Sequence, residues 1–150
     1  MEMNVITEMG FEKIRKKISG ISSGVVVYSS EDDDLNRRVS EKLKIDMLLI
    51  SQGKRKDFMK QRNSGLNHVL AKIAKKNNIE IGINFDEIVS SNGFRLAEIL
   101  ARIRQNIVLC NKAKVKMKFV VLEKKNERNI YDLKSLGLVL GMPTWMIKGF

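Results

Sequence analysis

The stretch IEIGINF, residues Ile79–Phe85, decides the fold because it is predominantly apolar and short. A run of this kind is typical of a strand in a parallel sheet that is covered on both faces. Comparable runs are GVVVYSS from Gly24, DMLLIS from Asp46, MKFVVL from Met117 and, more weakly, MNVIT from Met3. Segments with helical spacing separate them, and this alternation predicts an α/β fold with about five βα units and a parallel sheet.

The helical spacing is found at residues 8–18, 35–44, 63–76, 94–113 and 130–140. In the longest segment, steps of three and four residues predict a buried stripe made of Leu96, Leu100, Ile103, Ile107 and Cys110. Glu98 and Arg102 are spaced for an ion pair on the outer face of that helix. We expect Asn63 or Ser64 to cap the helix of residues 63–76. The acidic run at residues 31–34 suits the start of the helix at 35–44.

Right-handed crossovers between parallel strands would curl such a sheet toward a barrel. Five βα units are too few to close an eight-stranded barrel. We therefore expect either an open sheet or a βα barrel from which units are missing. The chain has one proline, Pro143, and no low-complexity segment that would act as a linker, so one domain over residues 1–150 is expected.

The composition points to a polyanionic partner. The chain has 28 Lys and Arg against 17 Asp and Glu, a formal net charge of +11. Such cations neutralise phosphates and release condensed counterions. Cys110 is the only cysteine, which excludes an intramolecular disulfide and a cysteine-rich zinc site. A signal-peptide pattern and a membrane-spanning apolar run are both missing, so we expect a cytoplasmic protein.

The signals for catalysis are weak. A magnesium-dependent phosphoesterase could use the carboxylates that follow the predicted strands, although these could equally cap the next helices: Glu31, Asp86, Glu87 and Glu123. His68, the single histidine, could act as a general base, but no nucleophile elbow or phosphate-binding GxxxxGK[ST] loop accompanies it. Cys110 falls on an inward stripe, which favours a buried structural thiol. The favoured hypothesis therefore has no catalytic residue and no metal ligand in this chain.

Two basic segments carry a stronger signal. GKRKDFMKQR, residues 53–62, would lie at the carboxyl end of a strand, and NKAKVKMK, residues 111–118, at a helix-to-strand junction. Solvated charge is the usual explanation of such runs. Two runs in one strongly basic chain favour phosphate contacts instead. Aromatic residues make up only 6% and form no base-stacking motif, so we expect recognition of backbone and shape, without sequence reading.

Three blocks resemble the protein component 3 family of archaeal and eukaryotic ribonuclease P: SGLNHVLAKIAKKNN, IEIGINFDEIVSSNGF and RNIYDLKSLGLVLGM. Residues 65–71 match the first family block. Family members have an Arg-Lys-Asp triplet before this block, and Arg62, which falls on its middle position, is also basic. In the last block, Ile130 and Tyr131 replace a Pro-Arg pair, while three positions match: Arg128, Asp132 and Leu133.

The resemblance implies a TIM-like βα barrel that lacks the metal-binding histidines of related hydrolases. Family members are longer at the N-terminus, so the implied barrel is shortened there in this chain and can stay open. In that family the RNA subunit, with its magnesium ions, removes the 5′ leader from precursor tRNA, and component 3 pairs with component 2. The implied role is thus an RNA-binding, non-catalytic subunit of a ribonucleoprotein endonuclease that acts in tRNA processing. It would bind no cofactor itself, would have ribonuclease P RNA and component 2 as partners, and would meet precursor tRNA indirectly. A general RNA-binding scaffold is a third possibility.

The basic segments and the resemblance together give the candidate RNA-binding residues Lys54, Arg55, Lys56, Lys60, Arg62, His68, Lys72, Lys76, Lys112 and Arg128. For His68, an RNA contact and a purely structural role both remain open.

Overall fold

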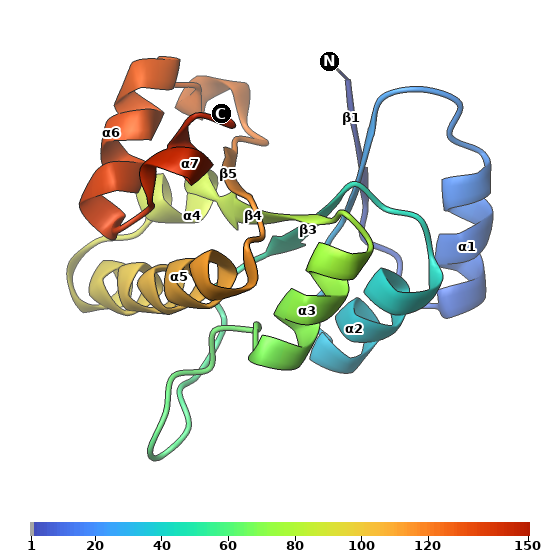
Figure 1. Cartoon of the computed structure of the whole chain (residues 1–150), viewed down its shortest axis with the longest axis horizontal. Helices are drawn as coiled ribbons and strands as arrows, with labels where there is room; N and C mark the ends of the chain where they lie inside the picture. The colour runs from blue at the N-terminus through green and yellow to red at the C-terminus, as the bar shows by residue number, and fades with distance from the viewer. Residues whose placement is uncertain (1) are drawn as a thin grey trace.

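The structure is a computed structural model that describes residues 2–150, and a single parallel sheet forms its centre (Figure 1). The five strands follow one another across the sheet in chain order: β1 (Met3–Ile6), β2 (Val25–Tyr28), β3 (Met47–Ile50), β4 (Glu80–Asn84) and β5 (Met117–Val120). Every neighbouring pair is parallel. Each strand lies within one of the predicted runs, which confirms the parallel βα reading.

Helices fill the crossovers and follow the last strand. The five predicted helices are confirmed to within a few residues, as α1 (Phe11–Ser19), α2 (Asp33–Lys42), α3 (His68–Lys76), α5 (Gly93–Ala113) and α6 (Ile130–Leu140). Three short elements had no recognisable period in the sequence, namely α4 (Phe85–Ser90), the 3₁₀ turn η1 (Lys124–Asn126) and α7 (Thr144–Ile147). Each is too short to repeat a helical pattern of apolar residues.

The two faces of the sheet are covered differently. One face packs against α1, α2, α3, α5, α6 and α7 through a core that includes Ile6, Tyr28, Leu48, Ile81 and Met117. The other face holds only a small buried cluster of Val27, Met47, Leu49 and Val120. Figure 1 shows the helices succeeding one another around one side of the sheet, from α1 to α6. This is the arrangement of a βα barrel, because a doubly wound sheet carries helices on both faces.

The barrel is open. Within residues 2–150, β1 and β5 are the edge strands and do not pair with each other. A cavity of about 370 Å³ lies on the inner face and reaches from Met3 on β1 to Val120 on β5. The predicted open, TIM-like βα arrangement is therefore confirmed.

The starts of two helices test the predicted caps. At α2, Asp32 accepts hydrogen bonds from the backbone N–H groups of Asp34 and Leu35, as the acidic run predicted. The predicted cap of α3 is wrong. That helix begins at His68, and its cap is Asn67, whose Oδ1 accepts from Leu70 N at 2.8 Å. The backbone turns at Gly65, where φ is +77°, a value that a right-handed helix does not allow. The helix therefore cannot start as early as residue 63.

Candidate RNA-binding surface

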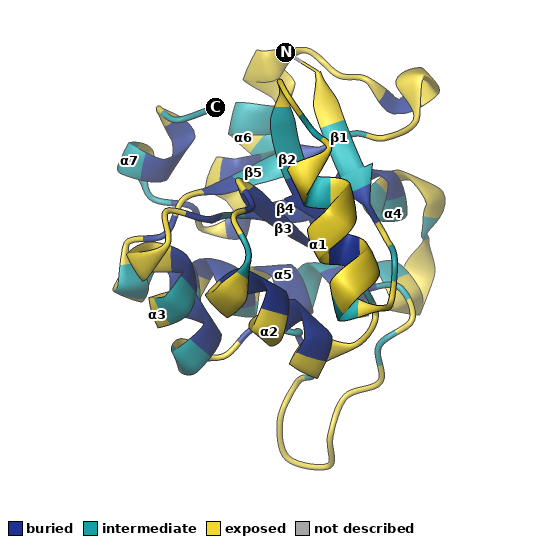
Figure 2. Ribbon diagram, turned by 90° about the vertical axis from the view of Figure 1, so that its right-hand side faces the viewer, coloured by how far each residue is buried: buried dark blue, intermediate teal, exposed yellow. Residues whose placement is uncertain are grey.

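The most prominent surface feature is the connection between β3 and α3, residues 51–67, which we call the β3–α3 loop. It projects away from the rest of the chain at the carboxyl end of the strands (Figure 1) and is exposed over most of its length (Figure 2). A backbone hydrogen bond from Phe58 N to Gln61 O, at 2.9 Å, closes its tip. The basic segment at residues 53–62 makes up the outgoing arm and the tip.

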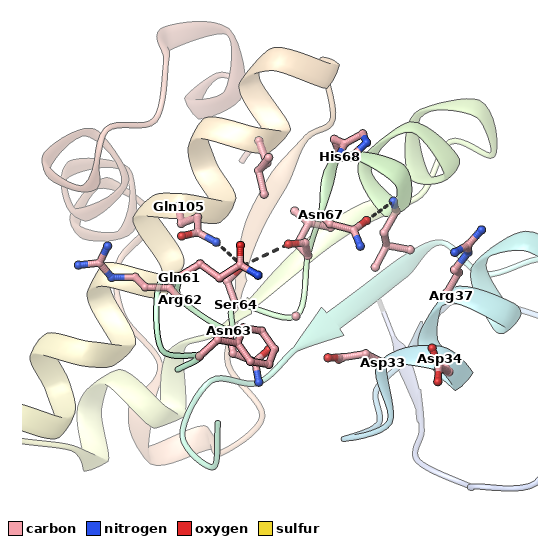
Figure 3. Close-up of a pocket in the computed structure, with 15 residues that line it drawn as sticks. Asp33, Asp34, Arg37, Gln61, Arg62, Asn63, Ser64, Asn67, His68 and Gln105 are labelled. Carbon is pink, nitrogen blue, oxygen red and sulfur yellow. Dashed lines mark hydrogen bonds between the residues drawn. The ribbon is translucent and has the colours of Figure 1, made fainter. Parts of the chain in front are cut away.

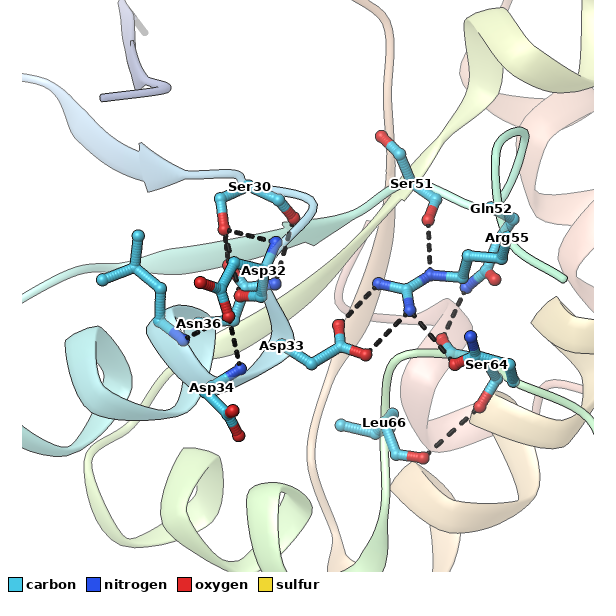
Figure 4. A network of polar contacts seen from close by, with 12 residues as sticks. Ser30, Asp32, Asp33, Asp34, Asn36, Ser51, Gln52, Arg55, Ser64 and Leu66 are labelled. Atoms are coloured by element: carbon cyan, nitrogen blue, oxygen red, sulfur yellow. Dashed lines mark hydrogen bonds and ion pairs between the residues drawn. The ribbon is translucent and has the colours of Figure 1, made fainter. Parts of the chain in front are cut away.

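Arg55 fixes the outgoing arm of the loop (Figure 4). Its two Nη atoms donate to the carboxylate of Asp33 at 3.0 and 2.8 Å, and its Nε donates to Ser51 O at 2.9 Å. One Nη also reaches Asn63 Oδ1 on the returning arm at 3.3 Å. The guanidinium is therefore largely committed inside the protein, and its charge is paired.

Arg102 fixes the tip of the loop from the middle of α5. The sequence spacing placed this residue in an outer ion pair with Glu98, and the structure corrects that expectation. Arg102 is buried, donates from Nε to Asp57 Oδ1 at 2.9 Å and from Nη1 to Gln52 O at 3.1 Å. A guanidinium enclosed in this way needs a carboxylate partner, and Asp57 comes to it from 45 residues away in the chain.

Ser64 fixes the returning arm. Its backbone carbonyl accepts from Gln52 Nε2 at 2.8 Å and from Asn106 Nδ2 at 3.0 Å, and its Oγ accepts from Gln105 Nε2 at 3.2 Å. Ser64, Gln52 and Asn106 are buried. The base of the β3–α3 loop is thus held from α2, from α5 and across its own two arms, which leaves only the tip to project into solvent.

The cations of the β3–α3 loop differ in whether they form ion pairs. Lys54 is exposed but lies 3.0 Å from Glu31, and Arg55 is paired with Asp33. Lys56, Lys60 and Arg62 are exposed, and within residues 2–150 none of the three makes an ion pair. The only acidic residue of the segment, Asp57, is neutralised by Arg102. The tip therefore presents three uncompensated positive charges.

His68 lies beside this loop as the exposed first residue of α3. It lines a cavity of about 400 Å³ together with residues from the loop, α2 and α5 (Figure 3). Arg62 and Arg37 line the same cavity. Arg128 does not line this cavity, and its guanidinium lies 5.8 Å from the ring centre of Phe85.

Two candidate residues lie at the opposite end of the sheet. Lys76 ends α3 and Lys112 is in the last turn of α5, and the carboxyl ends of these helices lead into the amino ends of β4 and β5. Lysines that were not among the candidates join them there and line a cavity of about 200 Å³: Lys75, Lys114 and Lys116. These lysines therefore form a surface separate from the candidates Lys54 to Arg62, which lie at the carboxyl end.

Of the four carboxylates of the alternative phosphoesterase reading, two hold loops and two make exposed ion pairs. Asp86 is buried and accepts from Leu122 N, Glu123 N and Asn126 Nδ2. Glu87 accepts from the backbone N–H groups of Gln52 and Gly53 at 2.7 and 3.0 Å. Glu31 pairs with Lys54 and Glu123 with Lys125. Across residues 2–150, no group of three His, Cys, Asp or Glu side chains is placed to hold a metal ion.

Cys110 is buried in the main core, as predicted, and burial raises the pKa of its thiol to about 12. The thiol therefore stays protonated and unreactive at neutral pH. None of the helices in residues 2–150 combines the length and apolarity needed to cross a bilayer.

An open, parallel βα barrel with a basic loop at the carboxyl end of its strands is the class of protein that these observations define. In sequence, the chain is similar to ribonuclease P protein component 3 of Methanococcoides burtonii, with 30% identity over 123 residues, which is 82% of this chain and 44% of that protein. It is 29% identical over 117 residues to the protein of the same name from Methanocaldococcus jannaschii, covering 76% of this chain and 47% of that one.

Ribonuclease P protein component 3 of Methanothermobacter thermautotrophicus is 25% identical to this chain over 139 residues, which is 81% of this chain and 55% of that protein. A chain in a cryo-EM structure of archaeal ribonuclease P with mature tRNA has the same fold, with a TM-score of 0.77 and 23% identity over 96% of this chain and 62% of that chain. No family model matches the sequence. The resemblance to ribonuclease P protein component 3 is thus confirmed, and the chain spans about half the length of the curated relatives it matches.

Proposed function

We propose that this chain is a non-catalytic protein subunit of ribonuclease P, which supports the catalytic RNA during 5′-leader removal from precursor tRNA in the cytoplasm. The observation that carries the proposal is the clamped β3–α3 loop with its three unpaired cations, in a chain similar to component 3 proteins. In this role the chain binds ribonuclease P RNA, pairs with component 2 and holds no cofactor, while the magnesium ions belong to the RNA.

The physical contribution is electrostatic. Lys56, Lys60 and Arg62 belong to one loop whose base is held by hydrogen bonds, so the backbone that carries them is already ordered when it meets an RNA backbone. Binding releases counterions and screens phosphate repulsion within the RNA, which lowers the magnesium concentration that the active RNA fold requires. The loop would therefore act on the RNA fold and would leave the scissile bond to the RNA.

The direct test is precursor-tRNA cleavage by the cognate catalytic RNA at limiting magnesium, with component 2 present and with or without this chain. We expect the rate to rise when both proteins are present. Simultaneous replacement of Lys56, Lys60 and Arg62 by alanine should remove most of that gain. A matched control replaces Lys13, Arg15 and Lys16 on α1, which are equally exposed and carry the same total charge, and it should keep the gain.

The outcomes separate the alternatives. No gain with the folded wild-type chain would contradict the ribonuclease P role. RNA binding that is indifferent to component 2 would instead favour a general RNA-binding scaffold. Hydrolysis of a phosphodiester by this chain alone, lost when Asp86 or Glu87 is replaced by the isosteric amide, would favour the phosphoesterase.

A further inference from the structure

The cavity beside His68 combines one aromatic ring with many polar groups. Its lining comes from the tip and returning arm of the β3–α3 loop, from α2, from the start of α3 and from α5 (Figure 3). Phe58 is its aromatic residue, 57% exposed to solvent. The polar members that matter here are Gln61, Arg62, Asn67, His68, Arg37 and Gln105. A volume of about 400 Å³ falls within the range of small-ligand pockets.

Phe58 is exposed in an unusual setting. An exposed apolar side chain at a loop tip is ordinarily unremarkable, but Phe58 lines a cavity together with Arg62 and lies two residues from Lys60 in the sequence. Its neighbour Met59 is 99% exposed and lines none of the five cavities. An aromatic face beside cations is the combination on which single-stranded nucleic acids stack. The low aromatic content of the sequence gave no sign of it.

The charges around the cavity favour an anionic ligand. Asp33, which lines it, is paired with Arg55, and Arg37 is joined to Glu41 only by an exposed contact of 3.9 Å, which contributes little. Arg62 makes no ion pair within residues 2–150, so the two guanidinium groups of Arg62 and Arg37 stand against the carboxylate of Asp34. The two guanidinium groups lie on opposite sides of the cavity (Figure 3). The positive end of α3 adds to this field, because Asn67 and His68 line the cavity at its first turn.

We propose that this cavity binds one unstacked nucleotide, with its base against the ring of Phe58 and the phosphates on either side of it near Arg62 and Arg37. Gln61 and His68 would offer donors and acceptors to the polar edge of the base. Asn67 would contribute its Nδ2 and Gln105 its Oε1, because Asn67 Oδ1 caps α3 and Gln105 Nε2 donates to Ser64. This inference rests on the proposed RNA-binding function. It adds to that function a stacking contact made by Phe58 at the tip of the β3–α3 loop. It also gives His68 a role in holding the base edge.

The test compares two RNA probes by fluorescence anisotropy. One is a single-stranded oligouridine that contains one 2-aminopurine, and the other is a blunt RNA duplex of the same length. Phe58→Ala should weaken binding of the single strand by about 5- to 150-fold, the range measured when a stacking aromatic is removed, and should leave duplex affinity within about twofold. Phe58→Tyr should restore single-strand binding, and the 2-aminopurine emission should change only for proteins with an aromatic at this position.

Met59→Ala is the matched control, since it removes a neighbouring apolar side chain that lies outside the cavity, and it should bind both probes like the wild type. Equal losses for Phe58→Ala and Met59→Ala, or no loss for either, would overturn the nucleotide site while leaving the RNA-binding proposal intact. A wild-type chain that binds neither probe would contradict the proposed function itself. Binding of uridine monophosphate as tight as that of the oligonucleotide would overturn an RNA strand as the source of the nucleotide.

Discussion

The guanidinium of Arg55 donates to both carboxylate oxygens of Asp33, at N···O distances of 2.8 and 3.0 Å, and so joins two strand-to-helix connections that are 22 residues apart. Two parallel hydrogen bonds of this kind fix the orientation of both groups as well as their separation. The most basic stretch of the chain therefore contributes one of its cations to holding the loop. Arg55 was a candidate RNA contact, and its geometry instead assigns it a positioning role.

Replacing Arg55 by lysine should lower the free energy of unfolding by about 1–2 kcal/mol, because an ammonium group cannot make the paired contacts to Asp33 or keep the bonds to Ser51 and Asn63. Urea unfolding at neutral pH measures the change. Lys54→Ala, which removes an exposed ion pair with Glu31, should stay within about 0.5 kcal/mol of the wild type. Equal effects of the two changes would contradict the positioning role.

Gly65→Ala should destabilise the chain more than Gly93→Ala. Both glycines have positive φ, +77° and +54°, so both changes carry a backbone cost of about 1 kcal/mol. At Gly65 the new Cβ would also lie 2.4 Å from Arg55 Nη2 and 2.8 Å from Ile50 Cγ2, whereas nothing lies within 4 Å at Gly93. Thermal or urea unfolding of the two variants ranks them, and a larger loss for Gly93→Ala would contradict the close approach at Gly65.

The pH dependence of stability should report the contact between Arg102 and Asp57. The hydrogen bond from Arg102 lowers the pKa of the Asp57 carboxyl below its usual value, and a second hydrogen bond from the Asn63 backbone acts in the same direction. A depressed folded-state pKa means that the stabilisation is complete above the unfolded pKa of about 3.9 and is lost as the pH falls through the folded value.

The stability difference between the wild type and Asp57→Asn should therefore be present at pH 6 and should shrink below about pH 4. Urea unfolding of both proteins between pH 3 and pH 6 gives this difference. Glu127→Gln changes an exposed carboxylate that makes no ion pair within residues 2–150, so it serves as the control and should stay close to the wild type in stability. A constant difference across the range would mean that Arg102 does not hold Asp57 ionised.

The two basic surfaces should contribute separately to RNA binding. Removing Lys56, Lys60 and Arg62 should lower the slope of log affinity against log salt by about 2–3, since each phosphate contact contributes about 0.7–0.9. The same number of alanines at Lys75, Lys76 and Lys112 tests the amino-end surface. If only one triple variant changes the slope, that surface alone meets the RNA. If both do, the slope changes should add.

Cys110 should be inert in the folded chain. Its buried thiol, with the pKa raised to about 12, should not react with a thiol reagent at pH 8 over minutes, and it should react at once in denaturing urea. Absorbance of the released chromophore gives both rates. Fast labelling of the native protein would mean that α5 opens away from the sheet.

The strands were predictable because a strand buried on both faces has a simple signature, and each of the five runs became a parallel strand. The separation of the basic residues could also have been deduced. In a parallel βα fold every helix ends near the amino end of the next strand, so Lys76 and Lys112 had to lie opposite the β3–α3 loop. The positions of these lysines at the ends of predicted helices were enough to place them, given a parallel βα fold.

The clamps of the loop were not predictable from spacing. Glu98 and Arg102 satisfy the rule for a helical ion pair, but the rule says nothing about burial. Arg102 faces inward, where Asp57 and the carbonyl of Gln52 offer it better partners. The role proposed for Phe58 was likewise not predictable, because a single aromatic residue forms no repeating sequence pattern. Its proposed contact with a ligand depends on the cavity that the folded loop creates.

The order of the strands has a consequence for how the chain folds during synthesis. Each strand pairs with the strand before it in the sequence, so every new βα unit finds its docking edge already made when it leaves the ribosome. The sheet can therefore grow by addition at one side, with short loop closures at each step. The long β3–α3 loop is the largest interruption in this progression. The contact of Arg55 with Asp33 can form early, whereas the clamps from Arg102 and Asn106 form only after α5 has been synthesised, because both residues belong to that helix.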